Sequence, residues 1–457
     1  MNKYWIILAL GFAVLSCNAP VGELSGSSNS SKMGFSDTKP IGMQLIRKGT
    51  FMMGAHKPSG MFPGREQAKQ VTVESFFIDE TEITNFQYRQ FVNWVRDSIA
   101  YRELIAIGRE EYAVPDPNNE SDSVKIRWSM KIRWNDRNED VQEALSKLFY
   151  QGDNELSKRQ LNPARLNYRY EIFNYDQTSL PQNQFNYKTN AYGPNAFVTV
   201  DTSYLDENGL LVHKTIRRKL TKRTDFFSVK MVNIYPDTLT WTRNMQFSYN
   251  DPKMKMYFSD PNYADYPVVG ITWEQAMAFC HWRTKIYNDT HRIKTEPYRL
   301  PTEAEWEFAA KGRDKNAIYP WSGEKLIDEK NNCFNANFKQ SRGNYVSDAG
   351  VTTKPVKSYN KVPNANGLYD MAGNVAEWTS TAWISTSGSV TADINPKFEY
   401  NAKVDDPIHL KKKVVKGGSW KDIPYFLQSG SRSTEYQFES RPFIGFRCVR
   451  SYKGDLK

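Results

Sequence analysis

Hydrophobic side chains recur with helical spacing in three segments, and each segment follows a threonine that stands three residues before a glutamine or glutamate. The threonines are Thr84, Thr272 and Thr302, and their partners are Gln87, Gln275 and Glu305. In this arrangement the two side chains satisfy free backbone N–H groups at the start of a helix. The sequence therefore predicts helices that begin at these three points, and Gly312 is expected to end the third.

Short alternating runs predict strands. Apolar and polar residues alternate over residues 71–77, over 413–415 ahead of the Gly417-Gly418 pair, and over 446–449 near the C-terminus. Between these runs the chain is rich in turn residues. We expect an α+β fold that is loop-rich, with short strands and few helices.

The first residues have the order of a secretory signal peptide. Lys3 supplies a basic start, residues 4–14 form an apolar run too short to span a bilayer, and Ser16 precedes Cys17. A cysteine directly after a small residue resembles the bacterial lipobox, which implies cleavage before Cys17 and acylation of that residue. An ordinary signal peptide with an incidental Cys17 is the alternative. Asn18 follows, so by analogy with the sorting rule of enteric bacteria we expect a lipid anchor in the outer membrane, facing the periplasm.

Composition divides the remaining chain. After the signal peptide of residues 1–16, residues 17–40 are rich in Ser, Gly and Pro and predict a flexible, lipidated tether. The globular part is expected over 41–450, with a tail at 451–457. Residues 97–264 mix charged and aromatic side chains and have few long apolar faces, so they are interpreted as an insertion into the globular part.

The composition also limits the classes of function. Tyr, Phe and Trp make up 14% of the residues, which suits a loop-rich fold or large protein interfaces. The formal charge of +10, from 61 basic and 51 acidic side chains, favours an acidic protein surface or anionic head groups as partner over nucleic acid in an exported protein. Beyond Cys17 the chain has Cys280, Cys333 and Cys448, so at most one disulfide can form. The histidines are scattered, which argues against a histidine-based zinc or iron site.

The insertion carries a basic run that includes Arg217, Arg218, Lys222 and Arg223. A run of charge is usually a solvated loop. The same stretch holds tyrosines among polar residues, as protein interfaces do, at Tyr168, Tyr170, Tyr175, Tyr187 and Tyr192. On the sequence alone, a solvated loop and a docking surface for an acidic partner both stay open.

Four motifs in the second half of the chain resemble those of the formylglycine-generating sulfatase-modifying family. They are RLPTEAEWE at 299–307, NGLYDMAGNVAEW at 366–378, GGSW at 417–420 and GFR at 445–447, with ETEITN at 80–85 upstream. The similarity covers roughly residues 43–96 and 263–450 and leaves the insertion between them. The resemblance implies the variant C-type lectin fold of that family, with little regular structure.

The resemblance also implies two structural calcium sites. At the first, Asp370 and Glu377 would give side-chain oxygens while Gly373 and Val375 give main-chain carbonyls, a ligand set that suits this cation. Capping of turns by Asp370 and Glu377 without a metal is the alternative. The second site, looser in its spacing, would take two side chains and two main-chain carbonyls, from Asn337, Asp348, Phe338 and Gly350.

The oxidase chemistry of the family is not expected to carry over. Active members oxidise a substrate cysteine with two copper-binding cysteines just after the Gly-Gly-Ser-aromatic strand, and Cu(I) needs such soft ligands. Here Asp422 and Leu427 stand at those positions, and Cys448 is expected to pack as a small buried hydrophobe. The histidine cluster of related iron-dependent enzymes is also missing from the sequence. The sequence predicts a fold retained without its oxidase site, with neither copper nor iron.

A closer resemblance covers nearly the whole chain. WKD at 420–422, YFLQ at 425–428 and YPVVGITWEQA at 266–276, together with the lipobox and the insertion, look like the gliding motility lipoprotein family GldK, called PorK in non-gliding relatives. This implies a structural part of the type IX secretion system of Bacteroidota that forms periplasmic rings by self-association, with a soluble GldN-like partner and other subunits. An active oxidase of the formylglycine-generating type and a glycan-binding, lectin-like module are the alternatives.

Overall fold

The structure is a computed structural model that describes residues 37–54, 68–115, 125–151, 160–207, 209–244, 256–312, 314, 316–328, 333–340, 352–359, 363–384 and 391–454. The chain divides into two compact units, Pro40–Ser451 and a small unit made of Met1–Lys39 and Tyr452–Lys457. In the small unit, the backbone N–H of Lys453 donates to the carboxylate of Asp37. Every helix and strand below belongs to Pro40–Ser451.

Short strands outnumber helices in the described part of the chain, as the sequence predicts. The α-helices are α2 (Asn85–Ala106), α3 (Glu139–Ser146), α5 (Tyr175–Thr178), α6 (Thr240–Asn244), α8 (Trp273–Thr290) and α9 (Glu303–Lys311). The strands outside the insertion are β1 (Met43–Ile46), β2 (Gly49–Met53), β3 (Lys69–Val73), β4 (Phe76–Asp79), β13 (Tyr298–Arg299), β14 (Ile327–Asp328), β15 (Cys333–Phe334), β16 (Ala376–Ala382), β17 (Lys412–Lys416), β18 (Ser433–Tyr436), β19 (Ile444–Gly445) and β20 (Val449–Ser451). Those inside it are β5 (Ala113–Val114), β6 (Lys125–Ile126), β7 (Asn167–Phe173), β8 (Phe185–Asn186), β9 (Ala191–Tyr192), β10 (Phe197–Leu205), β11 (Leu211–Lys219) and β12 (Phe227–Asn233).

All three predicted helices, α2, α8 and α9, are present with the predicted caps. Each capping threonine accepts a hydrogen bond from the backbone N–H three residues on, and the glutamine or glutamate there accepts one from the threonine N–H. α9 ends at Gly312, whose φ of 65° is easily reached by glycine. None of the helices in the described ranges has both the length and the apolar character needed to cross a membrane.

A four-stranded sheet brings the two ends of the globular unit together. Its order is β1-β4-β20-β13, and β20 pairs antiparallel with β4. α9 packs against β2 and β3 and against the second four-stranded sheet, whose order is β18-β17-β16-β19. The main core joins α9 to strands from both chain ends and includes Phe51, Phe76, Trp306, Leu368 and Val449. The segments before and after the insertion therefore form one folded body.

Two of the three strand predictions are wrong in their limits. The run 71–77 is split, because β3 ends at Val73 and β4 begins at Phe76, and every residue of β4 is buried. The run 446–449 falls mostly between β19 and β20. The run 413–415 is correct and lies in β17. β3 and β4 belong to different sheets, so the chain changes sheet within the run 71–77, and alternation does not mark that change.

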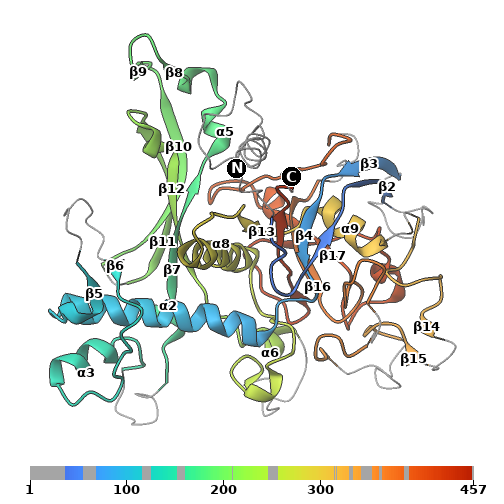
Figure 1. The fold of residues 1–457 in the computed structure, drawn as a ribbon, viewed down its shortest axis with the longest axis horizontal. Coiled ribbons are helices and arrows are strands. Elements are labelled where there is room, and N and C mark those ends of the chain that lie inside the picture. The colour runs from blue at the N-terminus through green and yellow to red at the C-terminus, as the bar shows by residue number, and fades with distance from the viewer. Residues whose placement is uncertain are drawn as a thin grey trace, which may run out of the picture. The chain divides into compact units, whose positions relative to one another are not determined.

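The insertion is folded in its described residues, so the solvated-loop interpretation does not hold for them. β10 and β11 pair antiparallel along their full length, and so do β7 and β12. β10 lies beside β12, and Figure 1 shows the four strands running alongside one another. Val198, Val200, Leu220 and Phe226 form a small core between them. A second cluster packs α3 against the C-terminal half of α2.

Two contacts made by tyrosine side chains, a hydrogen bond and a ring stack, join the insertion to the rest of the unit. The Tyr88 hydroxyl on α2 donates to the carbonyl of Ile234 at 2.9 Å. Tyr170 on β7 stacks on His281 of α8, with ring centroids 4.4 Å apart. The insertion is therefore held against α2 and α8 by specific contacts.

The five tyrosines predicted as interface aromatics divide into two groups. Tyr168 is buried, so it is not part of a partner surface, and Tyr170 and Tyr192 are half-buried in packed clusters. Tyr175 and Tyr187 are 74% and 89% exposed. These two are the most accessible of the five to a partner.

Candidate functional site

Three of the motifs meet at the carboxylate of Glu377 on β16. Arg447 donates to it twice, from Nε to Oε2 and from Nη2 to Oε1, both at 2.7 Å. The indole N–H of Trp306 on α9 donates to Oε2, also at 2.7 Å. β16 runs parallel to β19 with Glu377 opposite Gly445, which brings the following Arg447 to the carboxylate. This buried, two-point ion pair ties the 366–378 and 445–447 motifs to α9.

Arg447 also reaches two further segments. Its Nη1 donates to the carbonyl of Asp79 at 3.1 Å and its Nη2 to that of Tyr369 at 3.0 Å. Burial alone would lower the pKa of Arg447, but Glu377 raises it above its ordinary value. Arg447 was not among the predicted site residues, although the GFR motif that contains it was part of the resemblance.

Two more buried carboxylates, Glu82 and Asp370, lie beside this ion pair. Burial raises the pKa of Glu82 well above its ordinary value, and the charges of Asp370 and Glu377 add to the shift. Burial likewise raises the pKa of Asp370 to about 6. Three buried carboxyl groups therefore surround one guanidinium, and besides burial their mutual repulsion raises the pKa of Glu82 and Asp370. Glu82 was also missed, although it lies in the ETEITN motif.

The turn between Asp370 and Glu377 has an unusual backbone. Asp370, Gly373 and Asn374 have φ values of 54°, 75° and 58°. A Cβ at Gly373 would lie 2.4 Å from the carbonyl oxygen of Asn337, so this position requires glycine.

The same turn supplies donors to Glu82. Asn374 Nδ2 donates to both oxygens of Glu82, at 3.1 and 3.2 Å. The backbone N–H of Val375 donates to Glu82 Oε1 at 3.3 Å. The turn thus partly satisfies a carboxylate that burial would otherwise leave without partners.

Asn337, predicted for the second calcium site, is buried against this turn. Its Nδ2 donates to the carbonyl of Thr352 at 2.9 Å and to Asn374 Oδ1 at 3.3 Å. Its buried Oδ1 has no hydrogen-bond partner among the described residues. Phe338 is buried next to it, whereas Asp348 and Gly350 lie outside the described residues. An unpartnered amide oxygen is an acceptor that suits a cation.

The donors at both predicted sites fit calcium by type, because carboxylate, amide and carbonyl oxygens are its usual ligands. A bound cation would also stabilise the charged forms of Glu82 and Asp370, whose pKa values are raised without it. However, Glu377 is held by Arg447 and Trp306, and Asp370 Oδ2 accepts the N–H of Lys357 at 2.7 Å. Among the described residues, no three His, Cys, Asp or Glu side chains are grouped so that they could hold a metal ion. Main-chain carbonyls would have to supply much of the coordination.

Asp422 and Leu427, the residues that the resemblance predicts at the copper-binding positions, have structural roles. Asp422 Oδ2 accepts the N–H and the hydroxyl of Ser419 at 2.9 and 2.6 Å, which closes the turn after β17. Leu427 is fully buried in a cluster with Tyr319, Phe338 and Ala372. A carboxylate that caps a turn and a packed aliphatic chain offer no soft ligand for Cu(I).

The described cysteines lie elsewhere. Cys280 on α8 and Cys448 are buried, with their Sγ atoms 3.5 Å apart. Burial raises the pKa of the Cys448 thiol, and Cys280 beside it adds to the shift. The prediction that Cys448 is buried is confirmed. Cys333 is exposed, and Cys17 lies outside the described residues, so its lipidation stays a prediction.

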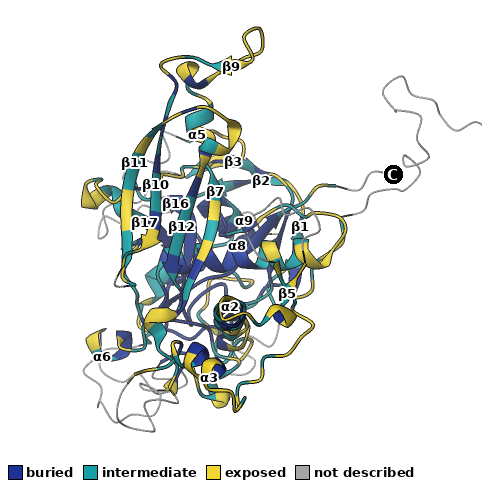
Figure 2. Cartoon of the chain, turned by 90° about the vertical axis from the view of Figure 1, so that its left-hand side faces the viewer, coloured by how far each residue is buried: buried dark blue, intermediate teal, exposed yellow. Residues whose placement is uncertain are grey.

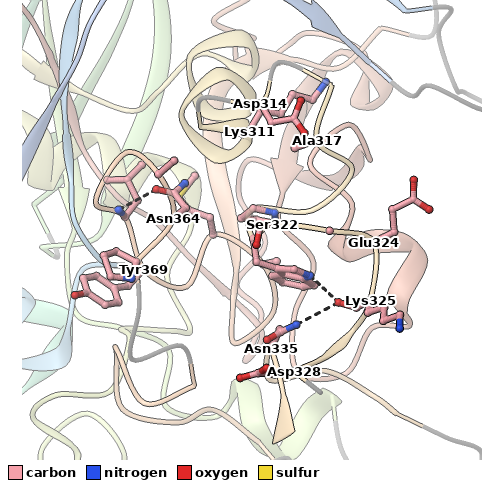
Figure 3. A pocket seen from close by; sticks show the side chains of 18 of the residues that line it. Lys311, Asp314, Ala317, Ser322, Glu324, Lys325, Asp328, Asn335, Asn364 and Tyr369 are labelled. Carbon is pink, nitrogen blue, oxygen red and sulfur yellow. Dashed lines mark hydrogen bonds between the residues drawn. The ribbon is translucent and has the colours of Figure 1, made fainter. Parts of the chain in front are cut away.

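A pocket of about 1060 Å³ shares Trp321 and Ala372 with the cluster that buries Leu427. Asn335 and Lys325 meet on its wall (Figure 3), where the Asn335 amide and the Trp321 indole N–H both donate to the Lys325 carbonyl. Its charged lining residues are Lys311, Asp314, Glu324, Lys325, Asp328 and Asp370. The described lining residues include no cysteine or histidine, so they offer charge, hydrogen bonds and ring surface rather than redox-active ligands.

The predicted basic run lies at the end of β11 and in the following 3-10 turn, Arg223–Phe226. Arg218 is engaged, because its guanidinium donates to the carbonyls of Asp225 and Phe227. Arg217, Lys222 and Arg223 are exposed. The structure therefore leaves three of the four predicted docking residues available and gives Arg218 a role within the turn.

The fold and the buried packing of these motifs define a protein of the formylglycine-generating enzyme type. The family described as the sulfatase-modifying factor enzyme 1-like domain matches residues 31–452, so the chain belongs to this family. The predicted fold class is thereby confirmed.

The chain is similar to active and inactive members of known function. It is 34% identical to the formylglycine-generating enzyme of Mus musculus over 195 residues, which are 41% of this chain and 45% of that protein. It is also 34% identical to the inactive C-alpha-formylglycine-generating enzyme 2 of Bos taurus over 190 residues, 40% of this chain and 50% of that protein. The chain thus spans at most about half the length of these relatives. Among solved structures, PvdO from Pseudomonas aeruginosa has a TM-score of 0.43 and 17% identity, covering 92% of this chain and 97% of that chain.

Proposed function

We propose that the chain is a non-catalytic, lipid-anchored scaffold of the type IX secretion and gliding machinery, of the GldK or PorK kind. One observation carries the proposal: the two copper positions hold Asp422, which caps a turn, and Leu427, which is fully buried. The buried thiols, Cys280 and Cys448, contact each other instead. The motifs that pack the domain, centred on Glu377 and Arg447, are kept while the ligands for oxidation are absent from their positions.

The anchor is an acylated Cys17, and the body faces the periplasm beneath the outer membrane. There the protein forms rings with further copies and with a soluble GldN-like subunit. Calcium is proposed as a structural cofactor at the two sites that the resemblance implies, the first with Asp370, Gly373, Val375 and Glu377 and the second with Asn337, Phe338, Asp348 and Gly350. The unpartnered Asn337 Oδ1 supports the second site. Copper and iron have no role.

The test combines metal analysis with partner capture. The detergent-solubilised protein is titrated with Cu(I) against a chelator of known affinity and assayed for oxidation of a cysteine peptide. In a separate experiment, the protein is cross-linked in cells, and the material that co-purifies with it is identified by mass spectrometry. We expect no copper, no oxidation and co-purification with secretion-system subunits. Stoichiometric copper with turnover would support an oxidase and overturn the proposal, as would the absence of every secretion subunit from the cross-linked material.

The anchor is tested separately. Changing Cys17 to Ala removes the thiol that accepts the lipid, so labelling with radioactive palmitate should disappear and the protein should leave the membrane fraction. Unchanged labelling in this variant would refute the lipoprotein assignment.

The pocket beside Trp321 supports a second candidate, a glycan-binding module, because an indole ring and several carboxylates can bind a sugar by stacking and hydrogen bonds. A pocket of this kind occurs in many folds, so it supports glycan binding less strongly than Asp422 and Leu427 support the scaffold. A glycan array decides between the candidates: specific binding that is lost on changing Trp321 to Ala would favour the lectin-like function.

A further inference from the structure

β11 is a long edge strand. It pairs with β10 without interruption, from Leu205 opposite Leu211 to Phe197 opposite Lys219. Within the described ranges no strand pairs with its other side, and none of its residues is buried. Figure 2 shows β11 at the outer margin of the molecule, in the colours of half-buried and exposed residues. Alternate backbone N–H and C=O groups of β11 therefore face outward, where another strand could pair with them.

This edge carries charge of one sign. Residues 211–223 contain six Lys or Arg residues and no Asp or Glu. The carboxylates that touch the segment are engaged: Asp201 accepts the hydroxyl of Thr215, and Asp225 accepts the backbone N–H groups of Thr221 and Lys222. Six basic side chains beside these two carboxylates leave the edge with a net positive charge, and the local potential attracts an acidic chain.

Two of the cations are held in place by aromatic rings. The guanidinium of Arg217 lies 4.6 Å from the ring centroid of Phe197, and that of Arg223 lies 5.9 Å from the ring centroid of Phe173. Stacking on a ring restricts a guanidinium and leaves its N–H groups free to bind a carboxylate. A side chain that is already ordered loses less entropy when a partner binds.

We propose that the outer edge of β11 binds an extended, acidic segment of a partner protein, which adds to the β10–β11 hairpin as a further strand. Backbone hydrogen bonds would supply the affinity, and the cations would select acidic side chains. The inference rests on the proposed scaffold function, because a scaffold needs a surface that holds its partner.

A second copy of the chain is a poorer occupant. Pairing β11 with another β11 would set Lys and Arg side chains opposite Lys and Arg, which destabilises cross-strand pairs. Lysine at an edge also serves to discourage unwanted pairing. The stacked arginines argue for a binding role, because a cation that only discourages pairing gains nothing from being fixed on a ring.

The experiment uses the full-length protein in detergent and two fluorescent peptides of β11's length, one of alternating Thr and Glu and one of alternating Thr and Lys. Anisotropy measures binding, and hydrogen exchange read by mass spectrometry locates it. We expect the Glu peptide to bind, to slow exchange in β11, and to lose roughly tenfold in affinity when salt is raised from low concentration to about 0.5 M. The Lys peptide should not bind.

Two charge-reversal variants test the surface. Arg217→Glu with Lys219→Glu should weaken binding of the Glu peptide by roughly tenfold or more. Arg133→Glu with Arg137→Glu, at exposed positions of the insertion outside the hairpin, changes the net charge equally and should leave binding unchanged. Far-UV circular dichroism and the exchange pattern outside β11 confirm that both variants fold.

Several outcomes would overturn the inference. They are equal binding of the two peptides, exchange protection outside β11, an equal effect of the control variant, or preferential binding to phosphatidylglycerol vesicles through the same residues. If the Arg217→Glu, Lys219→Glu variant aggregates while wild type binds neither peptide, the cations serve only to prevent unwanted strand pairing at this edge. If the reversed variant still captures its secretion partner in cells, this inference fails while the scaffold stands; if wild type captures none, the scaffold itself fails.

Discussion

The ammonium of Lys416 on β17 lies 3.1 Å from the carboxylate of Glu307 on α9, and both side chains are almost completely buried. Glu307 also pairs with Lys311 at 2.8 Å and accepts the backbone N–H of Gly54 at 2.8 Å. Burial alone would raise the pKa of Glu307, but Lys416 and Lys311 hold it below its ordinary value. Glu307 is the last residue of the RLPTEAEWE motif, so this motif joins α9 to β17 through an ion pair and to Gly54 through a hydrogen bond.

Changing Lys416 to Met should cost about 3–5 kcal/mol of unfolding free energy, because it removes one partner of a buried pair and leaves the carboxylate poorly balanced. Urea unfolding measures the loss. The control is Lys285→Met, since Lys285 pairs with Asp289 on the surface of α8 and such pairs contribute about 0–1 kcal/mol. Similar small losses in both variants would contradict the role of the buried network.

The cluster of Glu82 and Asp370 predicts a pH dependence. A carboxyl group whose pKa is raised in the folded protein binds its proton more tightly there than in the unfolded chain. Its contribution to stability is therefore largest at low pH and falls as the pH rises through the folded pKa, about 6 for Asp370. With chelator present, the stability of wild type relative to Asp370→Asn should fall between about pH 4 and 6.

Calcium should reverse this loss, because it favours the charged carboxylates. At a hundredfold excess over Kd, calcium would add about 2.7 kcal/mol to the stability of wild type near pH 7. Thermal unfolding with calcium and with chelator measures the effect, and Glu377→Ala should reduce it. An unchanged melting temperature on chelation would remove calcium from the proposal.

Local signals in the sequence predict the helices well. The threonine caps of α2, α8 and α9 need only residues three apart, so their start points are correct. The strand limits are predicted less well, because the chain changes sheet between β3 and β4 and alternation does not mark that change. The strands of the insertion were not predicted for another reason. The β7–β12 and β10–β11 pairs bury only a few apolar side chains, and the charged residues between these side chains hide the pattern in the sequence.

The residues of the candidate site could also be predicted only in part from the sequence. Asp370, Gly373 and Glu377 were found because they lie within one contiguous motif. Glu82 and Arg447 join them only through the fold, from segments 365 residues apart in the numbering, so spacing alone cannot reveal them. The resemblance contained both residues, but only the structure brings their charges to one place.

The two buried cysteines predict a redox state. Their sulfurs are 3.5 Å apart, so in the oxidising compartment that the proposed function implies we expect Cys280 and Cys448 to form a disulfide that does not involve Cys333. Unfolded, non-reduced protein should bind one maleimide, and reduced protein three. The two cysteines are 168 positions apart, and loss of a link across so long a loop should cost about 2–5 kcal/mol.

A scaffold should tolerate this loss in function. Replacing all three cysteines with Ala or Ser should lower stability and abundance, yet secretion should persist at matched protein level. Cys333→Ser alone is the control and should leave stability unchanged, since this side chain is exposed. Loss of secretion in a triple variant that folds and binds its partner normally would restore an enzymatic function.

Variants of Leu427 can distinguish a packing role from a chemical one, because the resemblance predicts this residue at a copper-binding position of active relatives and its side chain is fully buried. Changing Leu427 to Ala opens a cavity among Tyr319, Phe338 and Ala372 and should cost about 2–5 kcal/mol. Leu427→Met keeps the volume and should cost less than about 1.5 kcal/mol. Denaturant unfolding measures both, and secretion at matched abundance should equal wild type in the Met variant. If Leu427→Met folds normally but abolishes secretion, the position has a role beyond filling space, and the non-catalytic scaffold loses its main support.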